Sequence, residues 1–183
     1  MQSSLKEKFN KEVISKFKEK FSISNAMAVP KITKVILNSG IGKFLKEKEA
    51  IDEIVAAIRD ITGQKPVLAK AKKSISGFKV RQGQEIGVAV ALRGRRMWDF
   101  LDRLVYSTFP RVRDFQGISE KCFDSQGNLN VAVKEHIVFP EIAAENVKNV
   151  FGLQVTVVST AKTKEEGIEL LRLLGFPIKL HNT

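Results

Sequence analysis

Apolar residues recur every three or four positions in four stretches of the chain, and this spacing predicts four helices. In the first stretch the apolar side chains recur every fourth residue and lysines fill the intervening positions, so we expect an amphipathic helix. Pro110 and Gly175 end the third and fourth helices, and the capping box Thr163-x-x-Glu166 opens the fourth. The predicted helices cover roughly residues 2–22, 47–61, 95–109 and 163–174.

Extended segments rich in Ile and Val alternate with these helices. They predict strands at residues 31–37, 66–73, 85–93, 129–133, 136–139 and 153–160. The small residues of Asn38-Ser-Gly-Ile-Gly42 predict a turn after the first strand, and the sequence Asp124-Ser-Gln-Gly-Asn128 predicts another turn. No internal repeat or linker interrupts residues 1–183, so we predict a single α+β domain. We expect two layers: a mainly antiparallel β-sheet with helices packed on one face.

The segment from Glu85 to Arg93 alternates between two faces. Large apolar side chains point one way, whereas the other face carries small residues and ends at the Arg93 guanidinium. Small side chains let a large flat partner approach the backbone closely, so this surface is typical of a sheet that faces RNA. The neighbouring turn could hold a phosphate on its exposed amides, although a plain strand-to-helix turn is the favoured reading because no Walker motif is present.

The charge is high and uneven. The chain carries 31 Lys and Arg against 20 Asp and Glu, a net charge of +11, which makes a polyanion the expected partner. Residues 1–48 and 65–113 carry +7 and +9, whereas residues 49–64 and 114–161 each carry −3. We therefore expect two sides that face different partners. No apolar run approaches the roughly 18 residues of a membrane span, so we predict a cytoplasmic protein with no membrane partner.

Candidate catalytic chemistry is sparse. The only cysteine, Cys122, excludes an intramolecular disulfide and favours a reducing compartment, and we expect it to be a small buried side chain. His136 and His181 are the only imidazoles, and no zinc motif is present. We predict no catalytic residue, no metal and no cofactor. An RNA-modifying enzyme and a membrane binder that uses the phenylalanines of the first helix remain the alternatives.

The strongest local signal is a basic loop at residues 71–84, AKKSISGFKVRQGQ. It contains four bases and no acid, and Lys70 directly precedes it. The loop cations Lys72, Lys73, Lys79 and Arg81 can neutralise phosphates, and Phe78 offers a ring for stacking. A merely solvated loop does not explain the absence of acids. Because no helix motif that reads a DNA groove is evident, we favour structured RNA over DNA.

Several runs of sequence together resemble the bacterial-type "L-five" family of large-subunit ribosomal proteins. They occur in the family's order and cover most of the chain. The runs are VPKITKVILNSGIG (29–42), ITGQKPVLAKAKKSISGFKVRQG (61–83), LRGRRMWDFLDRL (92–104), PRVRDFQG (110–117), FDSQGN (123–128), IVFPEI (137–142), TAKTKEEG (160–167) and GFP (175–177).

The resemblance implies a structural, noncatalytic constituent of the large ribosomal subunit that binds 5S rRNA and helps attach it in the central protuberance. By likeness, five residues contact 5S rRNA: Asn38, Gly40, Gly42, Gln64 and Arg93. The basic loop would contact peptidyl-site tRNA through Lys72, Lys73, Ser74, Phe78, Lys79, Arg81 and Gln82. The other implied partners are large-subunit rRNA, other central-protuberance proteins and a basic protein of the small-subunit head, which the acidic stretch from Asp114 to Glu145 would meet at an intersubunit bridge.

The chain departs from the family pattern at a few positions. Ser39 stands where the family often has a larger residue, Gln116 replaces a common arginine, and Ser125 and Gln126 stand in the sequence DSQGN where DGRGN is usual. The changes at 116 and 126 each remove a base. The resemblance therefore assigns no individual bridge residue.

Overall fold

Five antiparallel strands form one sheet in the order β2-β3-β1-β5-β4. A computed structural model describes residues 4–45, 47–143, 145 and 147–179. The predicted α+β class is confirmed. The strand bounds are β1 Ile32–Gly40, β2 Val67–Lys70, β3 Glu85–Leu92, β4 Leu129–Val133 and β5 Leu153–Ser159.

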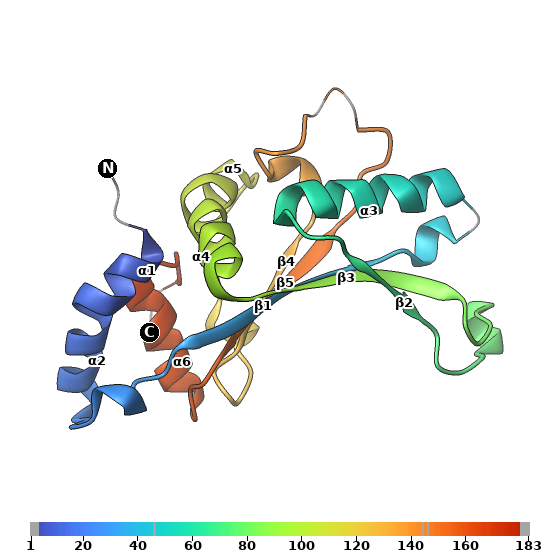
Figure 1. The fold of residues 1–183 in the computed structure, drawn as a ribbon. Coiled ribbons are helices and arrows are strands. Elements are labelled where there is room, and N and C mark those ends of the chain that lie inside the picture. Colours follow the sequence, from blue (N-terminus) through green and yellow to red (C-terminus); the bar gives the residue numbers. More distant parts are fainter. Residues whose placement is uncertain (1–3, 46, 144, 146, 180–183) are drawn as a thin grey trace.

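The helices gather on one face of the sheet and at one end of it (Figure 1). Helices α3 and α4 lie over the same face, whereas α1, α2 and α6 cluster at the end of the sheet opposite the basic loop. The helix bounds are α1 Leu5–Lys8, α2 Ile14–Phe21, α3 Lys48–Thr62, α4 Gly94–Arg103, α5 Phe109–Arg111 and α6 Lys164–Leu174.

The first predicted helix is continuous from α1 to α2 because a π-helical turn, Phe9–Val13, joins them. A step of four residues advances about 40° around an α-helix, so a strict spacing of four would spiral away from the core. The wider π turn absorbs part of that drift. Leu5, Val13 and Phe17 are fully buried as a result, and the backbone N–H of Leu5 donates to Asp102 on α4 at 2.8 Å.

Strand alternation separates a core face from an open face. On the core face, Val35, Leu37 and Val155 are buried beneath the helices. On the other face, pairing aligns Asn38 with Ala89 and Ile36 with Ala91. Figure 1 shows α3 and α4 on the opposite face of these strands. The predicted division of the segment 85–93 into an apolar face and a small-residue face is thus confirmed for β3.

The predicted turn at Asn38–Gly42 is wrong. Strand β1 continues to Gly40, because Gly40 pairs with Gly87 of β3 and the ladder persists through the small residues. The chain bends only at the 3₁₀ turn Gly42–Phe44. Ser39 is buried in the strand, and its hydroxyl donates to the carbonyl of Gly152 at 2.8 Å. The amide-lined phosphate cradle considered for this turn is therefore absent from residues 38–40.

Two further expectations need correction. Residues 136–139 do not form a strand, because a 3₁₀ turn at His136–Val138 buries the His136 ring in a stack on Phe151. Pro110 does not end the third helix, which continues to Arg111. A π-helical turn, Leu104–Thr108, precedes the proline and changes the hydrogen-bond pattern that Pro110 would otherwise interrupt.

Candidate nucleic-acid interface

The open face of the sheet offers a shallow surface of small and polar side chains. Gly87, Ala89 and Ala91 of β3 lie beside Asn38 and Gly40 of β1. A Cβ added at Gly87 would meet the carbonyl oxygen of Ser39 at 3.4 Å and Oδ1 of Asn38 at 3.7 Å. Gly87 itself is buried, so a partner on this face can approach the backbone closely at the exposed Gly40 and Ala91 and the half-buried Ala89.

The residues expected to contact 5S rRNA do not form one cluster. Asn38 and Gly40 lie on the open face itself. Gln64 precedes β2, Arg93 follows β3, and the two strands are antiparallel, so both residues lie at the same end of the strand pair. Gly42 belongs instead to the opposite end, where it lines a groove beside the basic loop.

Arg93 is exposed immediately before α4, and its backbone is extended there. Among the described residues, its guanidinium takes part in no ion pair, whereas the nearby Arg95 lies 3.8 Å from Asp99 and Arg103 lies 2.9 Å from Glu141. Arg93 therefore presents an unneutralised charge at the edge of the open face, as a phosphate-binding residue must.

A row of amides continues the open face across β5 and β4, and the sequence analysis missed it. Gln154 lies opposite Asn38, and Asn130 lies opposite Thr156. The Asn130 side-chain oxygen accepts from Gln154 at 3.4 Å and from Thr156 at 2.7 Å. Asn130 and Gln154 lie 92 and 116 positions from Asn38 along the chain, so only the strand register could have revealed the row.

The basic loop is held by hydrogen bonds within its own backbone. Ala71 donates to the Gln84 carbonyl at 2.8 Å and accepts from Gly83 at 2.9 Å, while Ile75 and Val80 exchange a pair of backbone bonds farther out. The Ser74 hydroxyl accepts from the backbone N–H of Gln82 at 2.9 Å. This bond gives the Ser74 side chain a role in ordering the loop, whereas Gln82 contributes only its backbone N–H.

The charged and aromatic side chains of the loop remain available to a partner. All four loop cations are exposed, and none takes part in an ion pair within the described part of the chain. Phe78 is 77% exposed, although a buried position would be usual for a phenylalanine. Figure 1 places the loop at the end of the sheet that lies away from α1, α2 and α6. The structure thus concentrates unpaired positive charge at one tip.

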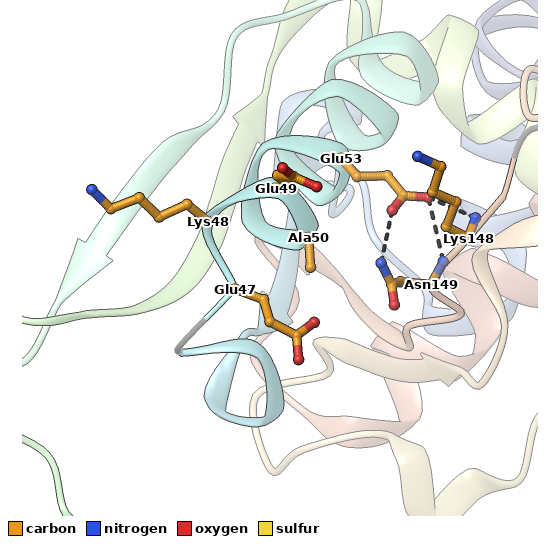
Figure 2. Close-up of a pocket in the computed structure, with 7 residues that line it drawn as sticks. All are labelled: Glu47, Lys48, Glu49, Ala50, Glu53, Lys148 and Asn149. Carbon is orange, nitrogen blue, oxygen red and sulfur yellow. Dashed lines mark hydrogen bonds between the residues drawn. The ribbon is translucent and has the colours of Figure 1, made fainter.

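The two acidic stretches meet on the helix-covered side. Figure 2 shows Glu53 of α3 turned toward Asn149, while Lys48 extends away. Glu53 accepts from the Asn149 side chain at 2.9 Å and from the backbone N–H of Lys148 at 3.0 Å. Burial would raise the pKa of the Glu53 carboxyl, but these hydrogen bonds outweigh it and lower the pKa below its usual value.

The hydrogen bonds of Glu53 to Lys148 and Asn149 form a clasp between α3 and the later segment. A hollow of about 630 Å³ lies beside this clasp. Glu47 and Glu49 contribute two more carboxylates to its wall. Within the described residues, no group of three or more His, Cys, Asp or Glu side chains is arranged to hold a metal ion. The Glu53 carboxylate is committed to its hydrogen bonds, so the clasp has a structural role: it fixes residues 148–149 against α3.

The residues considered for catalysis do not form a reactive pair. Cys122 lies in a 3₁₀ turn and packs against the core, although it is half-buried and not fully buried as expected. His136 is buried, and its Nδ1 accepts from the backbone N–H of Phe151 at 3.4 Å. Burial lowers the pKa of the His136 imidazole. His181 lies outside the described residues. His136 is therefore a packed, neutral residue of the core.

A sheet that is open on one face and flanked by unpaired cations is typical of proteins that bind extended polyanions. No helix among the described residues meets the length and hydropathy needed to cross a bilayer. Comparison with known families sharpens this class. Residues 25–81 match the family described as "Ribosomal protein L5", and residues 85–178 match the "ribosomal L5P family C-terminus".

Curated relatives extend the match over nearly the whole chain. The "Large ribosomal subunit protein uL5" of Halothermothrix orenii is 49% identical over 96% of this chain and 98% of its own length. The proteins of the same name from Carboxydothermus hydrogenoformans and Pediococcus pentosaceus are 51% and 49% identical, over 94% and 98% of this chain and 97% and 99% of their own lengths. The chain belongs to the uL5 family of ribosomal proteins.

Membership defines the broad role. The protein is a structural constituent of the large ribosomal subunit and not an enzyme, and it is part of the cytoplasmic ribosome. The resemblance inferred from the sequence runs is thereby confirmed. The two matched family segments meet within the basic loop, and both contribute strands to the same sheet: β1 and β2 come from the first, and β3 to β5 from the second.

Proposed function

We propose that the open sheet face binds 5S rRNA and helps to attach it in the central protuberance, together with large-subunit rRNA and neighbouring proteins. The observation that carries this proposal is the exposed, unpaired Arg93 beside an uncovered face of small residues. RNA surfaces are recognised largely by shape, through contacts to phosphates and 2′-hydroxyls. A flat face with few large side chains permits that approach, and a charge at its edge fixes the phosphate backbone.

Asn38 and Gly40 contribute to this face directly, and Gln64 flanks it at the same end as Arg93. The amides of Asn130 and Gln154 extend it with neutral hydrogen-bonding groups. Gly42 lies at the opposite end and would contact RNA only where the bound molecule passes the basic loop.

The basic loop is the proposed contact to peptidyl-site tRNA. Lys72, Lys73, Lys79 and Arg81 supply its charge, and the exposed ring of Phe78 offers a stacking surface. The Ser74 hydroxyl holds the loop in shape by accepting from the backbone N–H of Gln82. A preformed cationic tip can grip backbone shape without reading sequence, as a contact common to all tRNAs requires.

The acidic side suits a third partner. It comprises the stretch from Asp114 to Glu145, in which acids outnumber bases. This arrangement favours contact with a basic protein of the small-subunit head at an intersubunit bridge. Gln116 is not part of that surface through a free amide, because its oxygen accepts from Lys179 at 3.1 Å.

Substitution of Arg93 tests the 5S rRNA proposal. Arg93→Ala removes a charge-assisted contact, so we expect 5S rRNA binding to weaken by about 1–3 kcal/mol at physiological salt. Filter binding over a salt series measures the affinity. Arg59→Ala is the matched control, because it removes an exposed arginine from α3, where Arg59 lies beside Asp60. Equal affinities for the two variants would remove Arg93 from the site.

A further inference from the structure

A groove lies beside the basic loop, with a volume of about 750 Å³. It falls within the size range of small-ligand and peptide-anchor pockets. Apolar side chains make most of its wall, and the charged groups are confined to two lysines. The groove is lined by Gly42, Leu45, Ala71, Lys72, Lys73, Ile75, Phe78, Val80 and Ile86.

Exposed apolar surface is concentrated at this groove. Seven large apolar side chains of the described residues are markedly exposed, and three of them, Ile75, Phe78 and Ile86, line it. Ile75 is 50% exposed, and Phe78 projects still farther into solvent. A cluster of this kind marks a surface that is covered when a partner is bound.

The groove is already shaped before a partner arrives. The backbone pairing of Ile75 with Val80, and of Ala71 with Gln84, fixes the loop wall, while Ile86 comes from the start of β3. A partner would therefore lose little binding free energy to ordering this loop.

The chemistry of the wall distinguishes between occupants. A nucleobase inserted here would lose hydrogen bonds that its polar edges make to water, because the groove offers no polar side chain other than its lysines. An aliphatic or aromatic side chain would surrender none. The loop cations at the rim attract negative charge, and the loop itself contains no acid. The complementary partner combines apolar anchors with acidic flanks.

We propose that this groove docks a polypeptide segment of another protein that inserts apolar side chains between Ile75, Phe78 and Ile86 and places Asp or Glu beside the loop cations. This occupant differs from the RNA contacts proposed above. Because it uses the same cations as the proposed tRNA contact, binding of the peptide and of tRNA would be mutually exclusive. The segment would thus bind when the loop is free of RNA.

Selection from a displayed library of random 12-residue peptides tests the proposal on the full chain. We expect the enriched peptides to combine Leu, Ile, Phe or Trp with Asp or Glu. Ile75→Ser with Phe78→Ser should weaken an enriched peptide at least about tenfold by anisotropy, since two anchor contacts are lost. Val67→Ser is the matched control, because Val67 is 69% exposed on β2 and does not line the groove.

Three results would overturn the proposal: no peptide enriched above background, enriched peptides without apolar residues, or peptides that bind the double variant as tightly as the parent. The proposal would also be overturned if the double substitution weakened the binding of an oligouridylate RNA but not that of the peptide. That result would assign the groove to RNA. Unchanged thermal melting of the double variant would show that its loss of binding is local.

Discussion

Helix α6 packs so closely against the turn at residues 124–128 that a single methyl group should destabilise the protein. A Cβ at Gly167 would overlap the backbone of Gly127. In turn, a Cβ at Gly127 would lie 2.7 Å from the Thr163 carbonyl oxygen, and Gly127 has a φ of +75°. Both sides of this contact are backbone, so no side-chain rotation can relieve the overlap in Gly167→Ala.

The loss of stability depends on the hydrogen bonds that are weakened when the turn is displaced. The Asp124 carboxylate holds the turn by accepting from the backbone N–H groups of Gln126 at 3.0 Å and Asn128 at 2.8 Å. Displacement of the turn would weaken charge-assisted bonds of about 1.5–3 kcal/mol. Replacement of glycine by alanine within a helix returns about 1 kcal/mol. We therefore expect Gly167→Ala to lower the free energy of unfolding by about 0.5–2 kcal/mol.

Urea denaturation and thermal melting measure this change. For a chain of this size the melting temperature should fall by about 1–8 °C. Gly77→Ala is the matched control, because no atom lies within 4 Å of a Cβ placed there, and its stability should stay within about 0.5 kcal/mol of the parent. If Gly167→Ala were as stable as the parent, the close packing of α6 on the turn would be refuted.

Three other predictions concern the open face, the buried histidine and the basic loop. Gln154→Ala and Asn130→Ala should each weaken 5S rRNA binding by about 0.5–1.5 kcal/mol without changing its salt dependence, because the lost groups are uncharged; an altered salt slope in filter binding would contradict this. Burial lowers the pKa of His136 in the folded protein below the ordinary imidazole pKa of 6.5. The unfolded chain therefore binds more protons than the folded protein as the pH drops below 6.5, and the free energy of unfolding should fall there. His136→Gln should flatten that decline in urea titrations, and an unchanged pH profile would exclude the histidine. Replacement of the four loop cations by Gln should weaken the binding of peptidyl-site tRNA and leave 5S rRNA binding unchanged. If a folded variant lost affinity for 5S rRNA, the assignment of the loop to tRNA would be wrong.

Local sequence signals predicted the helices well. The apolar spacing placed the second helix within a residue of α3, and Gly63 adopts the left-handed conformation that ends it, with φ of +65°. Half of the predicted capping box of α6 is present, since the Thr163 hydroxyl accepts from the Glu166 backbone N–H at 3.3 Å. The Glu166 carboxylate accepts from the backbone N–H of Lys162 at 2.8 Å and not from that of Thr163. These features depend on residues close in sequence, so their pattern is visible without the fold.

Nonlocal pairing explains the errors. Asn38 and Gly40 read as turn residues, yet β3 supplies Ala89 and Gly87 as partners, and the ladder extends through them. The segment after β4 has strand composition, but burial of His136 on Phe151 gives a 3₁₀ turn. In each case the deciding contact comes from a distant or tertiary neighbour that composition does not reveal.

The candidate site also contains some features that the sequence predicts and others that depend on the fold. The basic loop and Arg93 could be predicted because charge and a missing acid are properties of a short segment. The amide row could not, because Asn130 and Gln154 join Asn38 only through the register of three strands. Likewise, the apolar groove required the folded loop to bring Ile75 and Phe78 beside Ile86.

The RNA that copurifies with the protein from cells tests the central claim most directly. Tagged full-length chain, released from ribosomes and washed at physiological ionic strength, should retain 5S rRNA in about one copy per protein, and Arg93→Ala should retain less. If the parent protein retained no ribosomal RNA, or retained other RNAs in preference to 5S rRNA, the open face would not be a 5S rRNA-binding surface.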